Sequence, residues 1–162
     1  MRYLTKNVSI ILIGFALALV SVSNALSQKS DMGGWEIDGE YNKHFSLDEF
    51  DSFRGNIVGI EKVVPLPGMS PGLALLIEIS GGEIITVHVC PLWFDNPSGI
   101  GVRNGDRVNV RGAWAEINGE EVFMLSKLKK GNDFSYKVRL TKDGTPFWTM
   151  TPEELEHERN SE

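Results

Sequence analysis

Residues 104–112 have the sequence NGDRVNVRG and contain the clearest strand signal of the chain. This stretch begins with the turn-forming residues Asn, Gly and Asp. It continues with valines that alternate with polar side chains, which is the pattern of a half-buried strand, and this strand is expected over 107–117. Asn118-Gly119 is a strong two-residue hairpin signal and leads into an apolar stretch over 120–128. The sequence therefore predicts a β-hairpin around this dipeptide.

Three further strands are expected before the hairpin. Residues 53–64 are rich in isoleucine and valine with two interspersed glycines, as in a long strand that bends at a barrel corner. A proline-rich loop over 65–72 precedes an apolar run over 73–79, and a Ser-Gly-Gly turn leads from that run into 83–90. Five strands with the longest connector between the third and the fourth match an oligonucleotide/oligosaccharide-binding (OB) barrel. The predicted fold class is all-β, with a five-stranded OB-like barrel over residues 52–130.

Three other segments surround the predicted barrel. Residues 28–51 are polar and acidic and are expected to form a linker followed by a short helical turn that Ser46 caps. Residues 131–150 are expected to add a C-terminal hairpin that covers a barrel edge and buries Trp148. Residues 151–162 begin with TPEE, which supplies a cap, a first-turn proline and a capping glutamate for a short acidic helix and tail.

Residues 1–27 are predicted to be a signal peptide or a membrane anchor helix. Arg2 and Lys6 precede an apolar run over 8–22, and small residues follow at 23–25. The run is shorter than the roughly 20 residues that cross a bilayer comfortably, but some bilayer thinning accommodates an anchor of this length. Cleavage and retention therefore both stay open. In either case an exported barrel is predicted, held on the outer side of the inner membrane or released into the periplasm.

Charge and cysteine content exclude some classes of protein. The 162 residues carry a formal net charge of −6, and a negative balance repels a phosphate backbone. Nucleic acid is therefore not expected as a partner. The single cysteine, Cys90, rules out an intramolecular disulfide. The sequence contains no Ser/His/Asp arrangement, phosphate-cradling glycine loop or recognisable carboxylate pair, so the chain is not expected to be an enzyme.

One set of side chains is a candidate metal site. His88 and Cys90 are two residues apart on an expected strand, so both are expected on the same face. Met69 lies in the loop before the second strand. Copper or iron would accept histidine, cysteine and methionine as ligands. The alternative is that these three side chains are ordinary core packing.

A second set of side chains is a candidate ligand face. Arg107 and Arg111 alternate along the fourth expected strand, and Lys127 lies near the end of the fifth. OB barrels bind nucleic acids or sugars on such faces. Trp93, in the connector after the third strand, adds an aromatic side chain to this set. The alternative is a solvated strand face with interspersed glutamates.

Several segments together resemble a known family. These are TVHVCPLWF at 86–94, GDRVNVRG at 105–112 and VRLTKDGTPFW at 138–148, and they resemble the exported OB-type domain of the MamS/MamX family of magnetosome proteins. The resemblance covers roughly residues 52–148, which is most of the chain after the predicted signal or anchor segment. It rests on the joint occurrence of the His-x-x-Pro-x-Trp segment and the Asp-Gly-x-Pro-x-Trp hairpin, because many OB barrels contain the central GDxVxVxG pattern.

The resemblance implies a protein of the magnetosome membrane that faces the mineral compartment, works with other magnetosome proteins and influences magnetite crystal growth. MamX-type members also carry Cys-x-x-Cys-His motifs for haem. With one cysteine, this chain is similar to the MamS type, and covalent c-type haem is excluded. Two other functions stay open. One is a general exported OB protein that binds a small ligand or a cation under stress, and the other is a metal or electron-transfer accessory protein that uses the candidate metal site.

Overall fold

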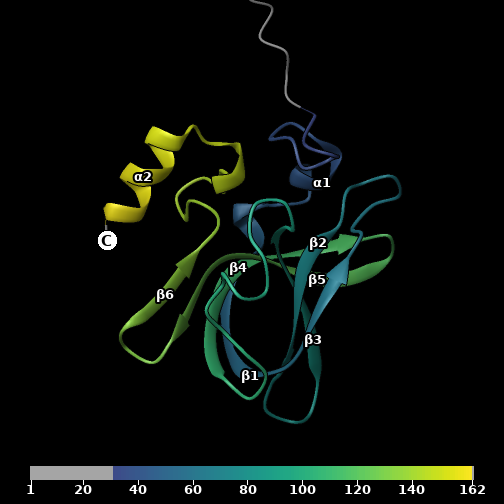
Figure 1. Cartoon of the computed structure of the whole chain (residues 1–162). Helices are drawn as coiled ribbons and strands as arrows, with labels where there is room; N and C mark the ends of the chain where they lie inside the picture. The colour runs from purple at the N-terminus through teal and green to yellow at the C-terminus, as the bar shows by residue number, and fades with distance from the viewer. Residues whose placement is uncertain (1–30, 162) are drawn as a thin grey trace, which may run out of the picture. The chain divides into compact units, whose positions relative to one another are not determined.

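The predicted hairpin around Asn118-Gly119 is present. In the computed structural model, which describes residues 31–161, strands β4 (Arg107–Ile117) and β5 (Glu120–Lys130) pair antiparallel across this turn (Figure 1). Asn118 and Gly119 both have positive φ, 55° and 78°, and such a backbone matches the twist of the two strands. In the first half of β4 the valines are buried and the arginines are exposed, as the alternation predicts.

The other three expected strands are also present, with slightly shifted ends. They are β1 (Phe50–Val63), β2 (Gly72–Glu78) and β3 (Ile84–Pro91). β1 pairs antiparallel with both β2 and β4, and its register with β2 shifts between Ile57 and Gly59. The irregularity lies beside one of the two glycines that predicted a bend in this long strand.

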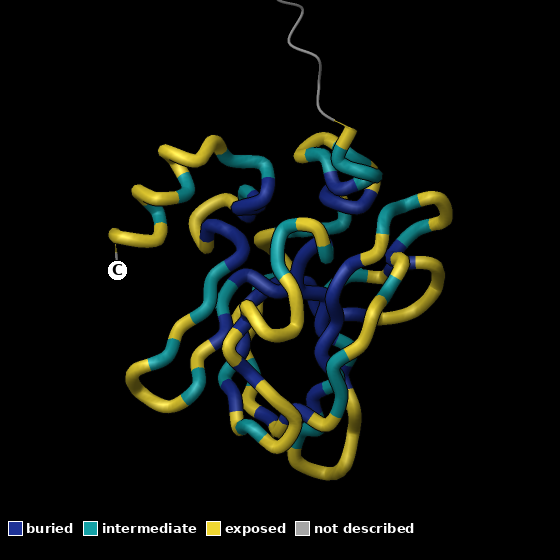
Figure 2. The backbone as a smooth tube through the Cα atoms, viewed as in Figure 1, coloured by how far each residue is buried: buried dark blue, intermediate teal, exposed yellow. Residues whose placement is uncertain are grey.

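The strand pairings form a closed cycle. The six-stranded, mostly antiparallel sheet has the order β3-β2-β1-β4-β5-β6, and β3 also pairs in parallel with β5 at two positions. The pairings therefore connect β1, β2, β3, β5 and β4 in a ring, while β6 (Phe134–Lys137) extends from β5. Figure 2 shows buried residues along the strands and exposed residues at the turns. The strand residues of the core include Ile57, Leu75, Ile77, Val87, Val108, Val110, Phe123 and Leu125.

The first part of the expected linker is packed against the sheet. Trp35 is 0% exposed, and Tyr41, at the short helix α1 (Glu40–Lys43), is also buried. The Trp35 indole nitrogen donates a hydrogen bond to the carbonyl of Ser70 at 2.9 Å. The two aromatic rings meet edge to face with centroids 4.7 Å apart. Residues 31–45 thus contribute to the core and do not act as a spacer, because two large aromatic side chains lie within an otherwise acidic, aperiodic stretch.

The helical turn expected after this segment forms as η1 (Leu47–Glu49), and the Ser46 side chain accepts a hydrogen bond from the Asp48 amide. The C-terminal helix α2 (Pro152–Asn160) begins with the predicted capping box. The signal or anchor segment predicted over residues 1–27 lies outside the described residues. Within residues 31–161, the structure has no helix with the length and apolar character needed to span a membrane.

The expected C-terminal hairpin over residues 131–150 is formed in part. β6 pairs with β5, and the returning segment makes one bridge, between Arg139 and Pro146, before the 3₁₀ turn η2 (Phe147–Thr149). Pro146 has no amide hydrogen for a β-ladder, so the return does not continue as a strand. Trp148 is buried, as predicted.

Candidate functional site

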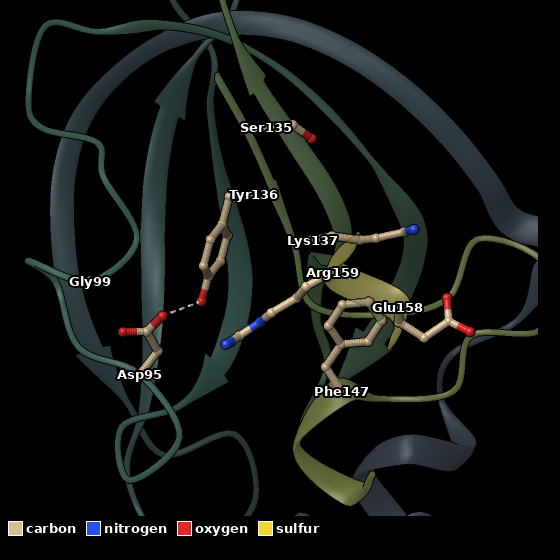
Figure 3. A pocket seen from close by; sticks show the side chains of 8 residues that line it. All are labelled: Asp95, Gly99, Ser135, Tyr136, Lys137, Phe147, Glu158 and Arg159. Atoms are coloured by element: carbon tan, nitrogen blue, oxygen red, sulfur yellow. Dashed lines mark hydrogen bonds between the residues drawn. The ribbon is translucent and has the colours of Figure 1, made fainter. Parts of the chain in front are cut away.

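A pocket of about 410 Å³ lies between β6 and α2 (Figure 3). Its lining includes Asp95 from the connector after β3, Tyr136 and Lys137 from β6, and Arg159 from α2. Figure 3 shows the Arg159 side chain reaching toward the Tyr136–Asp95 pair. Carboxylate, phenol, ammonium and guanidinium groups therefore meet at one opening, and such a pocket can hold a small polar ligand.

Tyr136 connects this pocket to the core. Its hydroxyl donates a hydrogen bond to Asp95 Oδ2 at 2.9 Å and lies 3.9 Å from the Cys90 sulfur. Burial raises the pKa of Cys90 to about 12. Burial, together with the neighbouring Cys90 and Asp95, also raises the pKa of Tyr136 above its ordinary value. Both groups are protonated at neutral pH, and a protonated thiol is a poor nucleophile and a poor metal ligand.

His88 lies in a different environment. It is buried, its Nδ1 is 3.4 Å from the Tyr41 hydroxyl, and the two rings are stacked with an interplanar angle of 27°. Burial lowers the pKa of His88 to about 4, so the imidazole is neutral at physiological pH. The contact joins β3 to the segment 31–45 and accounts for this buried polar side chain as a structural partner of Tyr41.

The register of β3 separates His88 from Cys90. Ala74 of β2 pairs with His88, and the adjacent Leu73 pairs with Cys90, so Val89 is the additional residue of a bulge. Adjacent residues of β2 point to opposite faces, and the two candidate ligands therefore do so as well. The alternation expected from sequence is interrupted at this bulge.

The remaining metal candidate, Met69, lies in the loop before β2 and packs beside Gly34 and the core. In the described part of the chain, no three His, Cys, Asp or Glu side chains are grouped so that they could hold a metal ion. The set of His88, Cys90 and Met69 stays a prediction, and its use would require ligands from both faces of β3 to come together.

The four residues of the candidate ligand face lie on two strands and one turn. Arg111 and Lys127 are direct cross-strand partners on β4 and β5. Arg107 lies on the same face of β4, because residues two and four apart on a strand share a face. Trp93 belongs to the turn after β3, where its side chain is 49% exposed. The structure thus brings the three cationic residues onto one sheet face, and Trp93 is not part of it.

Arg139 is the centre of a cluster that sequence reasoning missed. Its side chain is 1% exposed. Its Nη2 donates to Asn42 Oδ1 at 2.7 Å, and its Nη1 donates to the Gly144 carbonyl at 3.2 Å. The guanidinium carbon lies 4.7 Å from the ring centroid of Trp148 and 4.9 Å from that of Phe45. Burial lowers the pKa of Arg139 to about 10, so the side chain is a buried cation at neutral pH.

The Arg139 cluster connects the segment 31–45 to the segment 138–148. The Trp148 indole donates to the Trp35 carbonyl at 2.9 Å, and the Asn42 amide donates to the same carbonyl at 3.0 Å. The segments 31–45 and 138–148 thus share one hydrogen-bonded aromatic core. The signal that could have found it is the arginine within VRLTKDGTPFW, which lies seven residues before the buried Pro146-Phe147-Trp148 turn.

The low pKa of His88 makes the protein less stable in mild acid. The unfolded chain takes up a proton near pH 6.5, whereas the folded chain does so near pH 4. The contribution of neutral His88 to the free energy of unfolding is complete above pH 6.5. It is lost as the pH falls toward 4, by up to about 1.4 kcal/mol per pH unit. Urea unfolding at several pH values gives the free energy of unfolding of wild type and of His88→Gln as a function of pH. The difference between the slopes of these two pH profiles measures the contribution of His88.

The matched control for this measurement is His157→Gln, which changes an exposed histidine of α2. This variant is expected to keep the wild-type slope between pH 6.5 and 4. An identical slope in His88→Gln and wild type would show that His88 does not titrate as its burial requires.

The fold and the site together define a small protein with a mostly antiparallel β-sheet and a polar pocket beside an added edge strand. The family model of the MamS/MamX magnetosome protein family matches residues 49–135. This span contains β1 to β5 and more than half of the chain. The chain therefore belongs to the MamS/MamX magnetosome protein family, which associates it with the magnetosome. No curated protein matches the chain.

Proposed function

We propose that this chain is an exported, membrane-associated, non-enzymatic protein that controls the growth of magnetite crystals in the magnetosome. The observation that carries the proposal is the family match over residues 49–135, because this span holds every strand of the closed cycle. The segment that defines the family is thus the structural centre of the chain, and the magnetosome association applies to the folded unit.

The pairing pattern supports an OB-type barrel as the working part of the molecule. β1, β2, β3, β5 and β4 form a five-membered ring of pairings, and the parallel contact of β3 with β5 closes it. Such small five-stranded barrels present binding surfaces on their strands and loops. The barrel is therefore proposed as a rigid support for surfaces that bind partners or ligands.

The chemistry of the buried groups supports a role in binding and not in catalysis. Cys90 and Tyr136 are held protonated, and His88 is enclosed against Tyr41. The buried cation Arg139 is held by hydrogen bonds and aromatic rings within the fold. Catalysis by these residues would require an activated nucleophile or an accessible general base. We infer that the exposed polar surfaces, and not these buried groups, carry the function.

Export and membrane attachment rest on the sequence of residues 1–27. Two basic residues precede the apolar run, and this arrangement keeps the N-terminal side in the cytoplasm. The folded unit that follows is then delivered to the other side of the membrane. In a magnetosome, that side is the compartment in which the mineral grows.

Deleting the gene in its host tests the proposal. Crystals of the deletion strain, measured by electron microscopy, are expected to be smaller or altered in shape compared with wild type. Expression of the full chain is expected to restore them, whereas a chain without residues 1–27 is expected to fail although it is produced. Crystals of unchanged size and shape in the deletion strain would contradict a role in crystal growth.

A further inference from the structure

A second pocket, of about 560 Å³, lies on the outward face of β1, β4 and β5. Its lining combines cationic and amide side chains: Arg54, Arg107, Asn109, Lys129 and Asn132. No aspartate, glutamate or aromatic side chain belongs to this lining. The pocket is thus a positively charged hollow on a chain whose net charge is −6.

The strand register places these side chains in a defined pattern. Arg54 pairs with Asn109, and Asn109 pairs with Lys129, so the three residues form a row across β1, β4 and β5. Arg107 lies two residues from Asn109 on the same face of β4. Adjacent strands are about 4.8 Å apart, so the backbones of Arg54 and Lys129 are separated by about two strand spacings. One compact ligand in this gap reaches the cationic groups on both sides.

The cations of this pocket differ from Lys130, a neighbouring cation of the sheet, in having no carboxylate partner among the described residues. Lys130, the next residue along β5, forms a salt bridge with Asp106, in which Nζ lies 3.1 Å from Oδ2. By contrast, within residues 31–161 no carboxylate pairs with Arg54, Arg107 or Lys129. Each of these cations faces an asparagine across the strands, but like charges around one pocket still repel one another. Three cations that have no carboxylate partner among residues 31–161 therefore surround one pocket, and a bound anion would relieve their repulsion.

The chemistry of the lining indicates the class of anion. Two guanidinium groups offer planar pairs of donors that match phosphate oxygens, and a lysine adds a point charge. Asparagine amides supply further donors. Single-stranded nucleic acid would in addition require aromatic side chains for base stacking, and the lining has none. We infer that this pocket binds a compact multivalent oxyanion of the phosphate class, a property that goes beyond the proposed role in crystal growth and does not depend on it.

Isothermal titration calorimetry with the purified full chain and inorganic pyrophosphate tests this inference. Arg107→Ala and Lys129→Ala are each expected to weaken binding about tenfold or more, because each removes a charge-assisted contact. The matched control is Lys62→Ala, which removes an exposed cation of β1 outside the pocket and is expected to change the affinity less than about twofold. Unchanged circular dichroism and thermal midpoints establish that all variants are folded.

Two further ligands distinguish the source of the phosphate. Binding of short-chain phosphatidylglycerol below its micelle concentration, weakened by the same two variants, would identify a lipid headgroup, with short-chain phosphatidylcholine as the zwitterionic control. Binding of pyrophosphate without phosphatidylglycerol would identify a free anion. The inference is overturned if neither ligand binds, if citrate binds as tightly as pyrophosphate, or if Lys62→Ala weakens binding as much as the pocket variants do.

Discussion

Replacing Arg139 by alanine is expected to lower the free energy of unfolding by about 3–5 kcal/mol. The change leaves Asn42 Oδ1 and the Gly144 carbonyl without their buried donors. It also opens a cavity between the rings of Trp148 and Phe45, which the guanidinium fills. Urea unfolding, followed by circular dichroism and by tryptophan fluorescence, measures the loss.

Two further variants separate the causes of this loss. Arg103→Ala removes a loop arginine whose side chain is 88% exposed and is expected to change stability by less than about 0.5 kcal/mol. Arg139→Met keeps much of the side-chain volume without the charge, so it is expected to lose less than Arg139→Ala, since apolar replacements of buried charges are often tolerated. A loss below about 1 kcal/mol in Arg139→Ala would show that the cluster does not hold the two ends of the unit together.

Replacing Trp35 by alanine is expected to cost about 3–5 kcal/mol as well. The ring is fully buried between Tyr41 and Trp148, with centroids at 4.7 and 5.7 Å. Its loss also leaves the Ser70 carbonyl without the indole donor. The same urea titration applies, and limited proteolysis is expected to show faster cleavage within residues 31–45.

Trp93→Ala is the matched control for this prediction, since it removes the same type of side chain from a half-exposed position. It is expected to cost less than about 1 kcal/mol. If Trp35→Ala and Trp93→Ala had equal, small effects, residues 31–45 would be a spacer after all, and the sheet would be stable without them.

The strands were predictable from sequence because their signals are local. The alternation over 107–117 follows from the pleat of a strand, and Asn118-Gly119 follows from the positive φ that a two-residue turn requires. The same alternation placed Arg107 and Arg111 on one outward face. Arg54 and Lys129 were not part of that prediction, because only the pairing of β1, β4 and β5 brings them beside Arg107.

The other features depend on contacts between distant parts of the chain. Trp35 and Tyr41 lie in an acidic stretch without periodicity. Trp148, a partner of Trp35, is more than a hundred residues away in the sequence. The bulge at Val89 depends on how β3 pairs with β2, which the sequence of β3 alone does not specify. It interrupts the strict alternation from which His88 and Cys90 were expected on one face. The pocket beside Tyr136 and Arg159 was not expected because its lining comes from the connector after β3, from β6 and from α2, which are far apart in the sequence.

In the proposed function, the folded unit works on the mineral-facing side of the magnetosome membrane. Protease protection of isolated magnetosomes measures this placement, with an antibody against the folded unit as the readout. The unit is expected to resist protease while the membrane is intact and to be degraded once detergent opens it. Degradation in intact magnetosomes at the rate seen with detergent would place the folded unit on the cytoplasmic side instead.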